Sequence, residues 1–388
     1  MNEPKLRFKA DDGSQFPDWE EKTVGDMTVE LQDYESLSSG YPLMTSSRTG
    51  LMMQNEFRSK SSTDDSTAIF SVVPRGVATY RHMSDDDIFH FNINNLVDKG
   101  LVSKEYPVFN TKDNYNLYLL VEYLNSSRNF LNFCKAQKKG GTRTRLYFKV
   151  LKDFKLNMPS LPEQQKIAEF LSTIDTVIEK QKETVSAWEE RKKGVMQKLF
   201  SQEVRFKADD GSEFPEWKEK KLEDVVEFLD GQRKPLEAGQ RVSGKYPYYG
   251  ASGIIDYVEN YIFDEELILL SEDGANILDR NYRVCFLAKG KYWVNNHAHV
   301  LKAMDGNVNG FICEQLESFD YRKYNSGGAQ PKLNQATCRS IIMNIPCLEE
   351  QQKIADCLSS LDEVIEKQKA TLAAWKELKK GLLQQMFV

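Results

Sequence analysis

The sequence lacks long apolar runs, and no stretch approaches the roughly 18 consecutive apolar residues that a membrane-spanning helix requires. Its first residues, MNEPKLRFKADDG, contain no apolar segment and predict no signal peptide. The chain has 6 cysteines, and these show neither CxxC spacing nor a disulfide framework. These absences predict reduced thiols, a cytoplasmic location and no membrane partner.

Motifs for chemistry on DNA are missing as well. We find no Gly-rich turn for a methyl donor, and no Asn/Asp-Pro-Pro-aromatic tetrapeptide to hold a flipped base. The fragment AKGKY at 288–292 does not complete a P-loop. PDWEEK at 17–22 contains pieces of a metal-nuclease motif, but its repeat PEWKEK replaces the aspartate with Glu216, which favours a structural anchor. The sequence therefore predicts no catalytic residue and no metal ligand.

An excess of positive charge is also missing. The formal net charge is −6, which excludes a basic coat over the whole surface, so any contact with DNA must come from local patches. The hydrophobic content of 40% and the aromatic content of 11% indicate an ordered globular protein. A length of 388 residues allows two domains and additional helices.

The most informative feature that is present is a stretch at Leu161–Phe200 that occurs again at the end of the sequence. Gln164 corresponds to Gln351 and Phe200 to Phe387, and 23 of the 37 positions between these limits are identical. Apolar residues recur in both copies at steps of three and four, which is typical of helices that pack along a seam. We therefore expect two long helices.

Each seam has the same pattern in both copies. The seam residues are Ile167, Leu171, Ile174, Ile178, Val185, Trp188, Val195 and Leu199 in the first copy, and Ile354, Leu358, Leu361, Ile365, Leu372, Trp375, Leu382 and Met386 in the second. Both copies interrupt it at the same places, Gln181/Gln368 and Lys192/Lys379. Neither helix can bury its seam alone, so we expect the two to pack on each other, with both tryptophans buried in the pair or at a partner surface. Two unrelated surface helices are the alternative.

A second repeat precedes each domain. RFKADDGSQFPDW at 7–19 returns as RFKADDGSEFPEW at 205–217, with 11 of 13 residues identical. ADDGS is a turn composition, and the aromatic residues around proline predict an anchor onto the following domain. The order is therefore segment, domain, long helix, and then the same again.

The two regions between these repeats mix short alternating stretches with polar turns, which predicts α+β domains with largely antiparallel sheets. In the first region we predict strands at 68–73, 76–83 and 145–151, and a helix at 114–137. In the second we predict a hairpin at 246–263 and strands at 266–273 and 295–304. GGTRTRL at 140–146 aligns with GGAQPKL at 327–333, so both regions return to a common frame before the helix.

A basic run at 128–155 is the strongest candidate for DNA contact. It holds nine basic residues and one acidic residue, Asp153. A solvated helix end is the alternative, but the run crosses GGTRTR, where glycines permit close backbone approach. Arg143 and Arg145 would share a strand face and could reach guanine edges or phosphates. The second region is less basic, so its recognition of DNA must depend on neutral groups at Tyr248, Tyr249, Ser252, Asn276 and Gln330.

Two histidines in NNHAHV, His297 and His299, would share a face if this segment is a strand. They could pair on a metal, but no cysteine or carboxylate cluster accompanies them. A polar pair that faces DNA, or one that is merely hydrogen-bonded, is the favoured interpretation.

With these motifs in hand, the chain resembles the specificity subunit of type I restriction–modification systems. The resemblance rests on the doubled EQQKIA helix with its IEKQK…W…KKG continuation, on YGASGI, EDGAN and NNHAHVL, and on AQPKLN at 329–334. It implies an α+β fold with an internal pseudo-twofold repeat, in which a long antiparallel two-helix coiled coil separates two target recognition domains. The implied segments are recognition domains at 1–158 and 202–346, and spacer helices at 159–201 and 347–388.

The resemblance also implies function and partners. Each domain would read one half of a bipartite, asymmetric site on double-stranded DNA, and the chain would catalyse nothing itself. The helices would set the separation of the half-sites and dock two modification subunits and ATP-dependent restriction subunits. S-adenosylmethionine, ATP and Mg would be bound by those partners, and this chain would hold no cofactor. Two alternatives stay open: a coiled-coil scaffold without selective DNA binding, and a fused methyltransferase.

The residues that we expect to contact DNA, from these patterns and this resemblance, lie in both regions: Arg48, Arg75, Tyr80, Arg81, His82, Arg143, Arg145, Tyr248, Tyr249, Ser252, Gly253, Glu272, Asp273, Asn276, His297, His299, Gln330 and Lys332. The residues that we expect in the helix pair or at partner contacts are Ile167, Leu171, Ile174, Ile178, Trp188, Ile354, Leu358, Leu361, Ile365 and Trp375.

Overall fold

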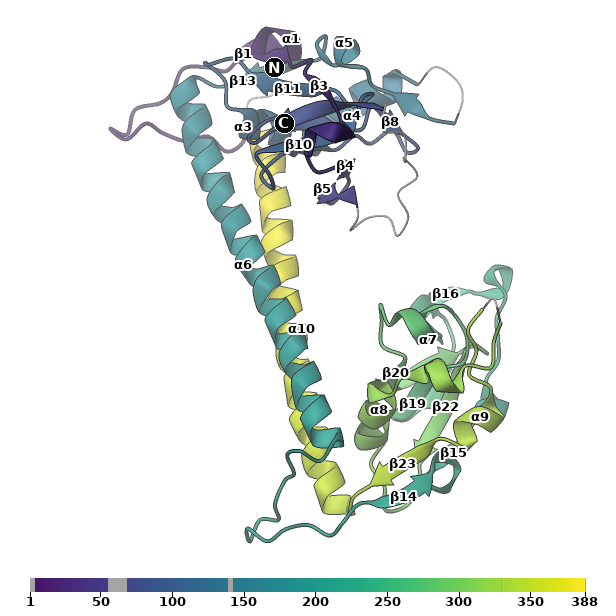
Figure 1. Ribbon diagram of the computed structural model, residues 1–388. Coiled ribbons are helices and arrows are strands. Elements are labelled where there is room, and N and C mark those ends of the chain that lie inside the picture. Colours follow the sequence, from purple (N-terminus) through teal and green to yellow (C-terminus); the bar gives the residue numbers. More distant parts are fainter. Residues whose placement is uncertain (1–3, 55–67, 139–141, 329, 388) are drawn as a thin grey trace. The chain divides into compact units, whose positions relative to one another are not determined.

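The computed structural model describes residues 4–54, 68–138, 142–328 and 330–387. The chain divides into two compact units, and each is described by itself. Unit 1 comprises residues 1–181 and 371–388, and unit 2 comprises residues 182–370. Two long helices, α6 (Leu161–Phe200) and α10 (Leu348–Met386), each contribute one part to either unit. The rest of each unit mixes short helices and strands, so the predicted α+β class is confirmed (Figure 1).

In the described ranges, unit 1 is built from short strands and short helices. Its strands are β1 (Glu20–Thr23), β2 (Thr28–Glu30), β3 (Tyr34–Ser36), β4 (Met44–Ser47), β5 (Gly50–Met53), β6 (Ile69–Pro74), β7 (Ala78–Tyr80), β8 (Met83–Ser84), β9 (Phe91–Ile93), β10 (Lys99–Ser103), β11 (Val108–Thr111), β12 (Thr144–Arg145) and β13 (Lys155–Met158). Its helices are α1 (Val24–Met27), α3 (Leu117–Ser126), α4 (Arg128–Ala136) and α5 (Phe148–Leu151), with a 3-10 turn η1 (Leu37–Ser39).

The strands of unit 1 form small antiparallel sheets in the orders β2-β11-β7-β9, β10-β6-β3, β1-β13, β12-β8 and β4-β5. Aromatic rings fill its main core, where Tyr80, Phe91 and Phe109 pack on one another. The same core includes Leu171 of α6 and Met386 of α10, so both long helices are part of it. Each such fully buried side chain contributes about 1.5–3 kcal/mol of apolar burial.

Unit 2 repeats this style with longer strands. Its strands are β14 (Lys218–Lys221), β15 (Val226–Phe228), β16 (Ser243–Gly250), β17 (Gly253–Val258), β18 (Phe263–Asp264), β19 (Leu267–Ser271), β20 (Cys285–Ala288), β21 (Lys291–Val294), β22 (Ala298–Ala303) and β23 (Ile342–Ile345). Its helices are α7 (Asn276–Asp279), α8 (Asn309–Ser318) and α9 (Gln335–Arg339), with 3-10 turns η2 (Leu222–Asp224), η3 (Asp230–Gln232), η4 (Ala238–Gln240) and η5 (Tyr321–Tyr324).

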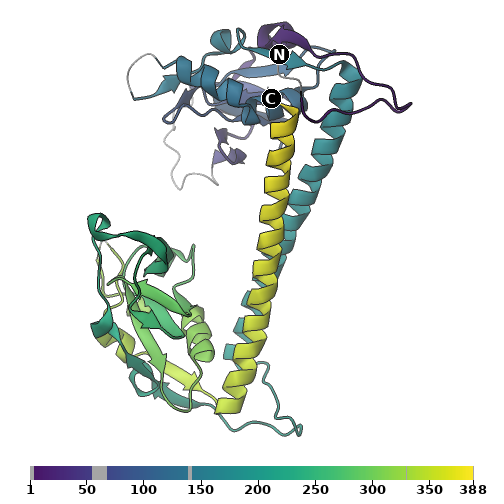
Figure 2. The ribbon, with the colours of Figure 1, turned by 180° about the vertical axis from the view of Figure 1, so that it is seen from behind.

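Two four-stranded sheets, in the orders β15-β22-β19-β20 and β17-β16-β21-β18, dominate unit 2. β16 and β21 pair in parallel, and the other strand pairs of these sheets are antiparallel. Helix α8 packs on the first sheet, and its Phe311 and Ile312 share a core with Ile354 and Leu358 of α10. Figure 2 shows the same elements from behind.

Within each unit, α6 and α10 lie side by side and run in opposite directions (Figures 1 and 2). In unit 2, Lys192 pairs with Asp362 at 2.7 Å and Glu189 with Lys369 at 3.0 Å, which is an antiparallel register. The predicted seam residues are buried at Ile167, Leu171, Ile174, Ile178, Ile354, Leu358 and Ile365, and half-buried at Leu361. The expected packing of the two helices is therefore confirmed.

The two lysines that interrupt the seam are largely shielded from solvent and paired: Lys192 is 7% exposed, and the side chain of Lys379 is 15% exposed. In unit 2, Lys192 lies 2.7 Å from Asp362 on the opposite helix and 3.0 Å from Glu314 on α8. In unit 1, Lys379 lies 2.7 Å from Asp175 and 2.8 Å from Glu122 on α3. Each lysine thus ties the helix pair to a helix of the globular domain. A buried amine requires such partners, because desolvation without them is costly.

The glutamate of the EQQ motif at the start of each long helix explains why the segments at 7–19 and 205–217 are repeated. Glu163 is fully buried, and it accepts hydrogen bonds from Arg7 at 2.9 Å and from Trp19 at 3.1 Å. In unit 2, Arg205 and Trp217 bind Glu350 in the same way, at 2.7 and 3.0 Å. We call this contact of arginine, tryptophan and glutamate the anchor. The segments at 7–19 and 205–217 therefore hold the first turn of a long helix.

The adjacent glutamines join the long helices to the domains. The Gln164 side chain accepts from the backbone N–H of Asn116 at 2.8 Å and donates to the carbonyl of Pro159 at 2.8 Å. Gln351 accepts from the N–H of Val308 at 3.0 Å and donates to Pro346 at 3.0 Å. Both glutamines thus satisfy backbone groups at the start of α3 or α8, which would otherwise be unpaired.

Three of the expectations need correction. Residues 145–151 are not a strand, because Phe148–Leu151 form one helical turn that buries Phe148 and Leu151. The helix predicted at 114–137 is two helices, since Ser127 ends α3 and caps α4 by accepting from the N–H of Phe130. Trp188 and Trp375 are only half-buried, so their burial within the helix pair was wrong, and their place at a partner surface stays a prediction.

Candidate nucleic-acid interface

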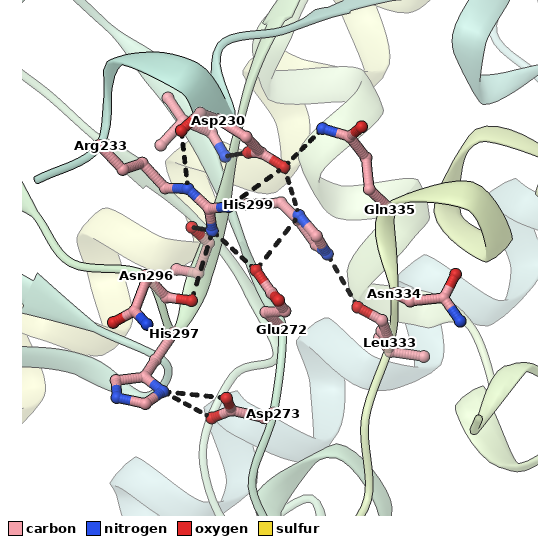
Figure 3. Close-up of polar contacts among 12 residues, drawn as sticks. Asp230, Arg233, Glu272, Asp273, Asn296, His297, His299, Leu333, Asn334 and Gln335 are labelled. Atoms are coloured by element: carbon pink, nitrogen blue, oxygen red, sulfur yellow. Dashed lines mark hydrogen bonds and ion pairs between the residues drawn. The ribbon is translucent and has the colours of Figure 1, made fainter. Parts of the chain in front are cut away.

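Three loops that are distant in sequence meet at one edge of unit 2 (Figure 3). Strands β19 and β22 are neighbours, so Glu272 follows β19 beside the start of β22. The N–H of Glu272 donates to the carbonyl of His297 at 2.9 Å, and the N–H of Leu333 donates to the carbonyl of Glu272 at 2.7 Å. These bonds bring EDGAN, NNHAH and QPKLN together.

His299 is buried beneath this edge, with 1% of its surface exposed. Its Nδ1 lies 2.7 Å from Asp230, and its Nε2 donates to the carbonyl of Leu333 at 2.8 Å. Burial is the largest single effect and disfavours the charged ring, but the hydrogen bond to Asp230, the contact with Cys338 and the charge of Asp230 together outweigh it and raise the pKa of His299 to about 10. The ring is therefore charged at neutral pH and positions the Leu333 loop, and the structure does not support its predicted direct contact with DNA.

Asp230 forms further hydrogen bonds, and the sequence did not predict it or these partners as part of the site. Burial alone would raise the pKa of its carboxyl, but the hydrogen bond and charge of His299, with the N–H of Val300 and the charge of Arg233, together lower this pKa below the ordinary value. The N–H of Val300 donates to it at 2.9 Å, and Gln335 donates to it at 2.8 Å. Neither the DGQR segment nor Gln335 carries a recognisable motif, and their meeting depends on tertiary structure.

Arg233 and Lys332 place positive charge at the rim of the same edge. Arg233 binds Glu272 at 2.7 Å and donates to the carbonyl of Ala298 at 2.8 Å. Lys332 lies 3.4 Å from Glu272 and is about half exposed. Glu272, predicted as a DNA contact, is thus mainly a partner for these two cations.

His297 is half exposed and turns away from His299 (Figure 3). Its Nδ1 lies 2.9 and 3.0 Å from the two oxygens of Asp273, and it precedes β22 rather than lying within it. The two histidines therefore do not share a face, which corrects the expectation of a paired arrangement. Within the described part of the chain, no group of three or more His, Cys, Asp or Glu residues could hold a metal ion.

The predicted β16–β17 hairpin is confirmed, and its residues divide by exposure. Tyr248 is 1% exposed and its hydroxyl accepts from the N–H of Leu236 at 2.9 Å, so its predicted direct contact with DNA is not supported. Tyr249 packs on Phe286 and Tyr292. The remaining predicted residues lie nearer the surface. Ser252 and Gln330 are exposed, and Gly253 begins β17 just after the hairpin turn with φ +117°. The side-chain amide of Asn276 binds the backbone of Tyr282.

An equivalent edge of unit 1 is formed by two stretches, YRHM at 80–83 and TRTRL at 142–146. The N–H of Leu146 donates to the carbonyl of His82 at 2.8 Å, and the hydroxyl of Tyr80 donates to the carbonyl of Leu146 at 3.0 Å. Tyr80 is fully buried and His82 is 3% exposed, so direct DNA contact by either is not supported. Burial also lowers the pKa of His82, whose ring stacks on Tyr147.

Arg143 and Arg145 flank a buried residue, Thr144, and both are exposed, as the predicted alternation requires. Arg143 is paired with Asp85 at 2.7 Å. Arg48 pairs with Asp86 at 2.6 Å. The glycines at 140–141 lie outside the described residues.

The other predicted arginines of unit 1 differ in role. Arg81 is exposed, and with Arg48 and His82 it lines a hollow of about 580 Å³. Arg75 binds Asp98 at 2.9 Å and donates to the carbonyl of Asn95 at 2.7 Å, so it stabilises a turn. The exposed arginines at this edge are thus Arg48, Arg81, Arg143 and Arg145.

No helix in the described ranges is both long and apolar enough to cross a membrane. The long helices α6 and α10 instead carry charged faces.

Comparisons with known proteins agree with this arrangement. The chain is 38% identical over 152 residues to a putative type I restriction enzyme specificity subunit of Haemophilus influenzae, covering 39% of this chain and 38% of the relative. It is 29% identical over 273 residues to the type I restriction enzyme MjaVIII specificity subunit of Methanocaldococcus jannaschii, covering 61% of each. The match thus spans less than two thirds of either relative.

A crystal structure of a type I restriction–modification system S subunit from M. genitalium has a similar fold, with a TM-score of 0.61 at 17% identity over 100% of this chain and 99% of that chain. The family model described as type I restriction modification DNA specificity domain matches residues 89–186 and 215–374. That match covers more than half of the sequence, and the chain therefore belongs to the family of type I restriction–modification DNA specificity domains.

Proposed function

We propose that this chain is the DNA-recognition component of a type I restriction–modification complex and that it catalyses nothing itself. Residues 1–158 and 202–346 act as two target recognition domains, and each reads one half of a bipartite, asymmetric site. The observation that carries this proposal is that the two units share their anchors and helix-pair contacts but differ in their edge residues. A common frame with different loops is suited to two different half-sites.

The spacer helices, 159–201 and 347–388, set the separation of the half-sites and dock the partner subunits in the cytoplasm. These partners are two modification subunits, which carry S-adenosylmethionine, and restriction subunits, which use ATP and Mg. The partly exposed Trp188 and Trp375 support a docking role, because tryptophan is enriched at the centres of protein interfaces. The names of the relatives, which are specificity subunits of restriction enzymes, also favour it.

Direct contact with DNA falls to the exposed edge residues. In unit 1 these are Arg48, Arg81, Arg143 and Arg145, and in unit 2 they are Ser252, His297, Gln330 and Lys332, with the partly exposed Gly253 beside Ser252. The buried residues Tyr80, Tyr248 and His299 hold these loops in place. Arginine forks that reach guanine edges, and amides that reach adenine edges, are the chemistry that such loops offer.

Methylome sequencing of cells that express the chain with its co-encoded modification subunits tests the proposal. We expect one bipartite methylated site. Replacing residues 218–346 with the corresponding region of a relative should change one half-site and leave the other intact. Methylation without sequence preference would favour a scaffold, and methylation without any partner would favour a fused methyltransferase.

A further inference from the structure

Three consecutive aspartates of unit 1 meet three cations that come from different parts of the chain. Asp85 lies 2.7 Å from Arg143, Asp86 lies 2.6 Å from Arg48, and Asp87 lies 3.6 Å from Lys138. We call these residues, Asp85–Asp87, the acidic loop. Arg143 and Arg48 are more than half exposed, so they keep a free side toward solvent while the acidic loop holds the other.

The acidic loop is held in place by its own contacts. It follows β8, whose Ser84 and Met83 pair with Thr144 and Arg145 of β12. The hydroxyl of Ser84 donates to Asp86 at 2.8 Å, and Thr144 donates to Asp87. Asp87 has a φ of +65°, a left-handed conformation that is strained for most residues but tolerated by Asp and Asn. The carboxylates are thus built into the edge that carries the arginines.

This arrangement has a consequence for binding. A DNA phosphate is attracted to any exposed cation regardless of sequence, and this attraction supplies most of non-specific affinity. A cation already paired with a carboxylate must give up or share that partner to bind a phosphate. Only at the correct base sequence does the cation form a hydrogen bond to a base edge, which compensates for the weakened contact with the carboxylate. The carboxylates therefore weaken binding to wrong sequences more than binding to the right one.

We propose that Asp85, Asp86 and Asp87 are selectivity-determining residues that suppress non-specific DNA binding by pairing the arginines and lysine of the recognition edge. This inference rests on the proposed function, since it assumes that the edge contacts DNA. It goes beyond that function, because it assigns selectivity to acidic residues that would not themselves recognise DNA.

The test compares two triple variants of the full chain, each assembled with the co-encoded modification subunits. The first is Asp85→Asn with Asp86→Asn and Asp87→Asn, which keeps side-chain shape and suits the left-handed position. The matched control is Asp18→Asn with Asp33→Asn and Asp113→Asn, which removes the same charge from exposed positions of unit 1 outside the basic run at 128–155. Fluorescence anisotropy measures binding to a random-sequence duplex and to a duplex that carries the site found by methylome sequencing, at several salt concentrations.

We expect the acidic-loop variant to bind the random duplex about tenfold more tightly than the control, because each exposed ion pair is worth roughly 1.5- to 5-fold. Its affinity should also depend more steeply on salt, by about one to three released counterions. Affinity for the specific site should change less, so the ratio of specific to non-specific affinity should fall, with methylation appearing at secondary sites.

Equal binding of the random duplex by both triple variants would overturn the inference, and so would weaker binding by the acidic-loop variant. The double variant Asp85→Asn with Asp86→Asn leaves the contact between Asp87 and Thr144 intact, so it gives the same test if the triple variant folds poorly. If the wild-type complex does not prefer its methylated site over the random duplex, the proposed function fails as well. If the wild-type complex prefers its methylated site but the two triple variants bind the random duplex equally, the inference about the acidic loop is wrong and the proposed function still stands.

Discussion

In unit 1 the carbonyl of Leu146 accepts a hydrogen bond from the hydroxyl of Tyr80, whereas in unit 2 the carbonyl of Leu333 accepts one from the ring of His299. Leu146 and Leu333 occupy aligned positions in GGTRTRL and GGAQPKL, and both are fully buried. A neutral phenol therefore does in one unit what an imidazolium paired with Asp230 does in the other. The backbone geometry of the loop is shared, and the side chain that secures it is not.

The residues before each leucine show what this shared geometry permits. Arg143 and Arg145 of unit 1 align with Gln330 and Lys332 of unit 2, and all four are exposed. The chemistry presented at the edge therefore changes while the supporting bonds stay. This separation explains how two domains on one frame could recognise different half-sites.

The largest effect should come from removing the exposed cations of unit 1. Arg143→Ala combined with Arg145→Ala should abolish methylation in cells, since each good bidentate base contact is worth about 1–3 kcal/mol. The aligned pair in unit 2, Gln330→Ala with Lys332→Ala, should reduce methylation less, because Lys332 is already shared with Glu272. Methylome sequencing, with complex levels measured in parallel, checks both. Normal methylation by the arginine variant would contradict the role of this edge.

The anchors should behave alike in the two units. Glu163→Gln and Glu350→Gln each leave an arginine facing a neutral amide, and we expect each to cost about 3–5 kcal/mol, as for a broken buried ion pair. Hydrogen exchange should localise the loss to unit 1 for Glu163→Gln and to unit 2 for Glu350→Gln. Exposed Glu183→Gln, on α6, is the control. If one anchor could be removed without loss, the repeated contact would not be equivalent in the two units.

The seam lysines should distinguish the units. In unit 2, Arg283 lies 2.5 Å from Glu314 and 3.3 Å from Asp362, so it can partly replace Lys192. In unit 1, Tyr118 donates to Asp175 at 2.5 Å but brings no charge. Lys379→Met should therefore cost about 3 kcal/mol, and Lys192→Met roughly half of that.

The cost of Lys379→Met should also depend on pH. Burial raises the pKa of Glu122 above its ordinary value even with Lys379 present, and loss of the amine raises it further. An acid whose folded pKa is raised destabilises the protein once the pH exceeds its unfolded pKa. Thermal unfolding should thus show a larger loss at pH 8 than at pH 5. A loss that is independent of pH would mean that Glu122 finds another partner.

The sequence predicts structure that depends on contacts between residues close in the chain, and it does not predict contacts between residues that are far apart in the chain. The long helices could be predicted, because the steps from Ile167 to Ile178 are local and repeat in the second copy. The edge of unit 1 could be predicted only in part, because Arg143 meets Asp85 across 58 residues of sequence. Likewise Asp230 reaches Gln335 across 105 residues, and no local pattern marks that contact.

The same limit explains the residues whose burial was misjudged. His299 lies in a motif that carries the resemblance, and Tyr80 is placed in the recognition region by its position alone. Sequence cannot tell a ring that contacts a ligand from one that supports the loop. Trp188 and Trp375 fit the apolar periodicity, but a heptad pattern does not reveal how far a bulky ring protrudes from the seam.

Replacing these tryptophans should have a small effect on stability, and it tests whether the two halves of the helix pair are equivalent. A fully buried tryptophan costs about 3–5 kcal/mol when replaced by alanine, so a half-buried one should cost roughly 1–2 kcal/mol. Trp188→Ala and Trp375→Ala should therefore lower the thermal stability of the isolated chain slightly and equally. Their larger effect should be on co-purification with the modification subunits, since each ring exposes apolar surface that a partner could cover. Leu378→Ala, on an exposed face of α10, serves as a control for apolar surface lost elsewhere. If both tryptophan variants co-purify normally with the modification subunits, these positions are not docking contacts, and the half-buried rings serve the helix pair alone.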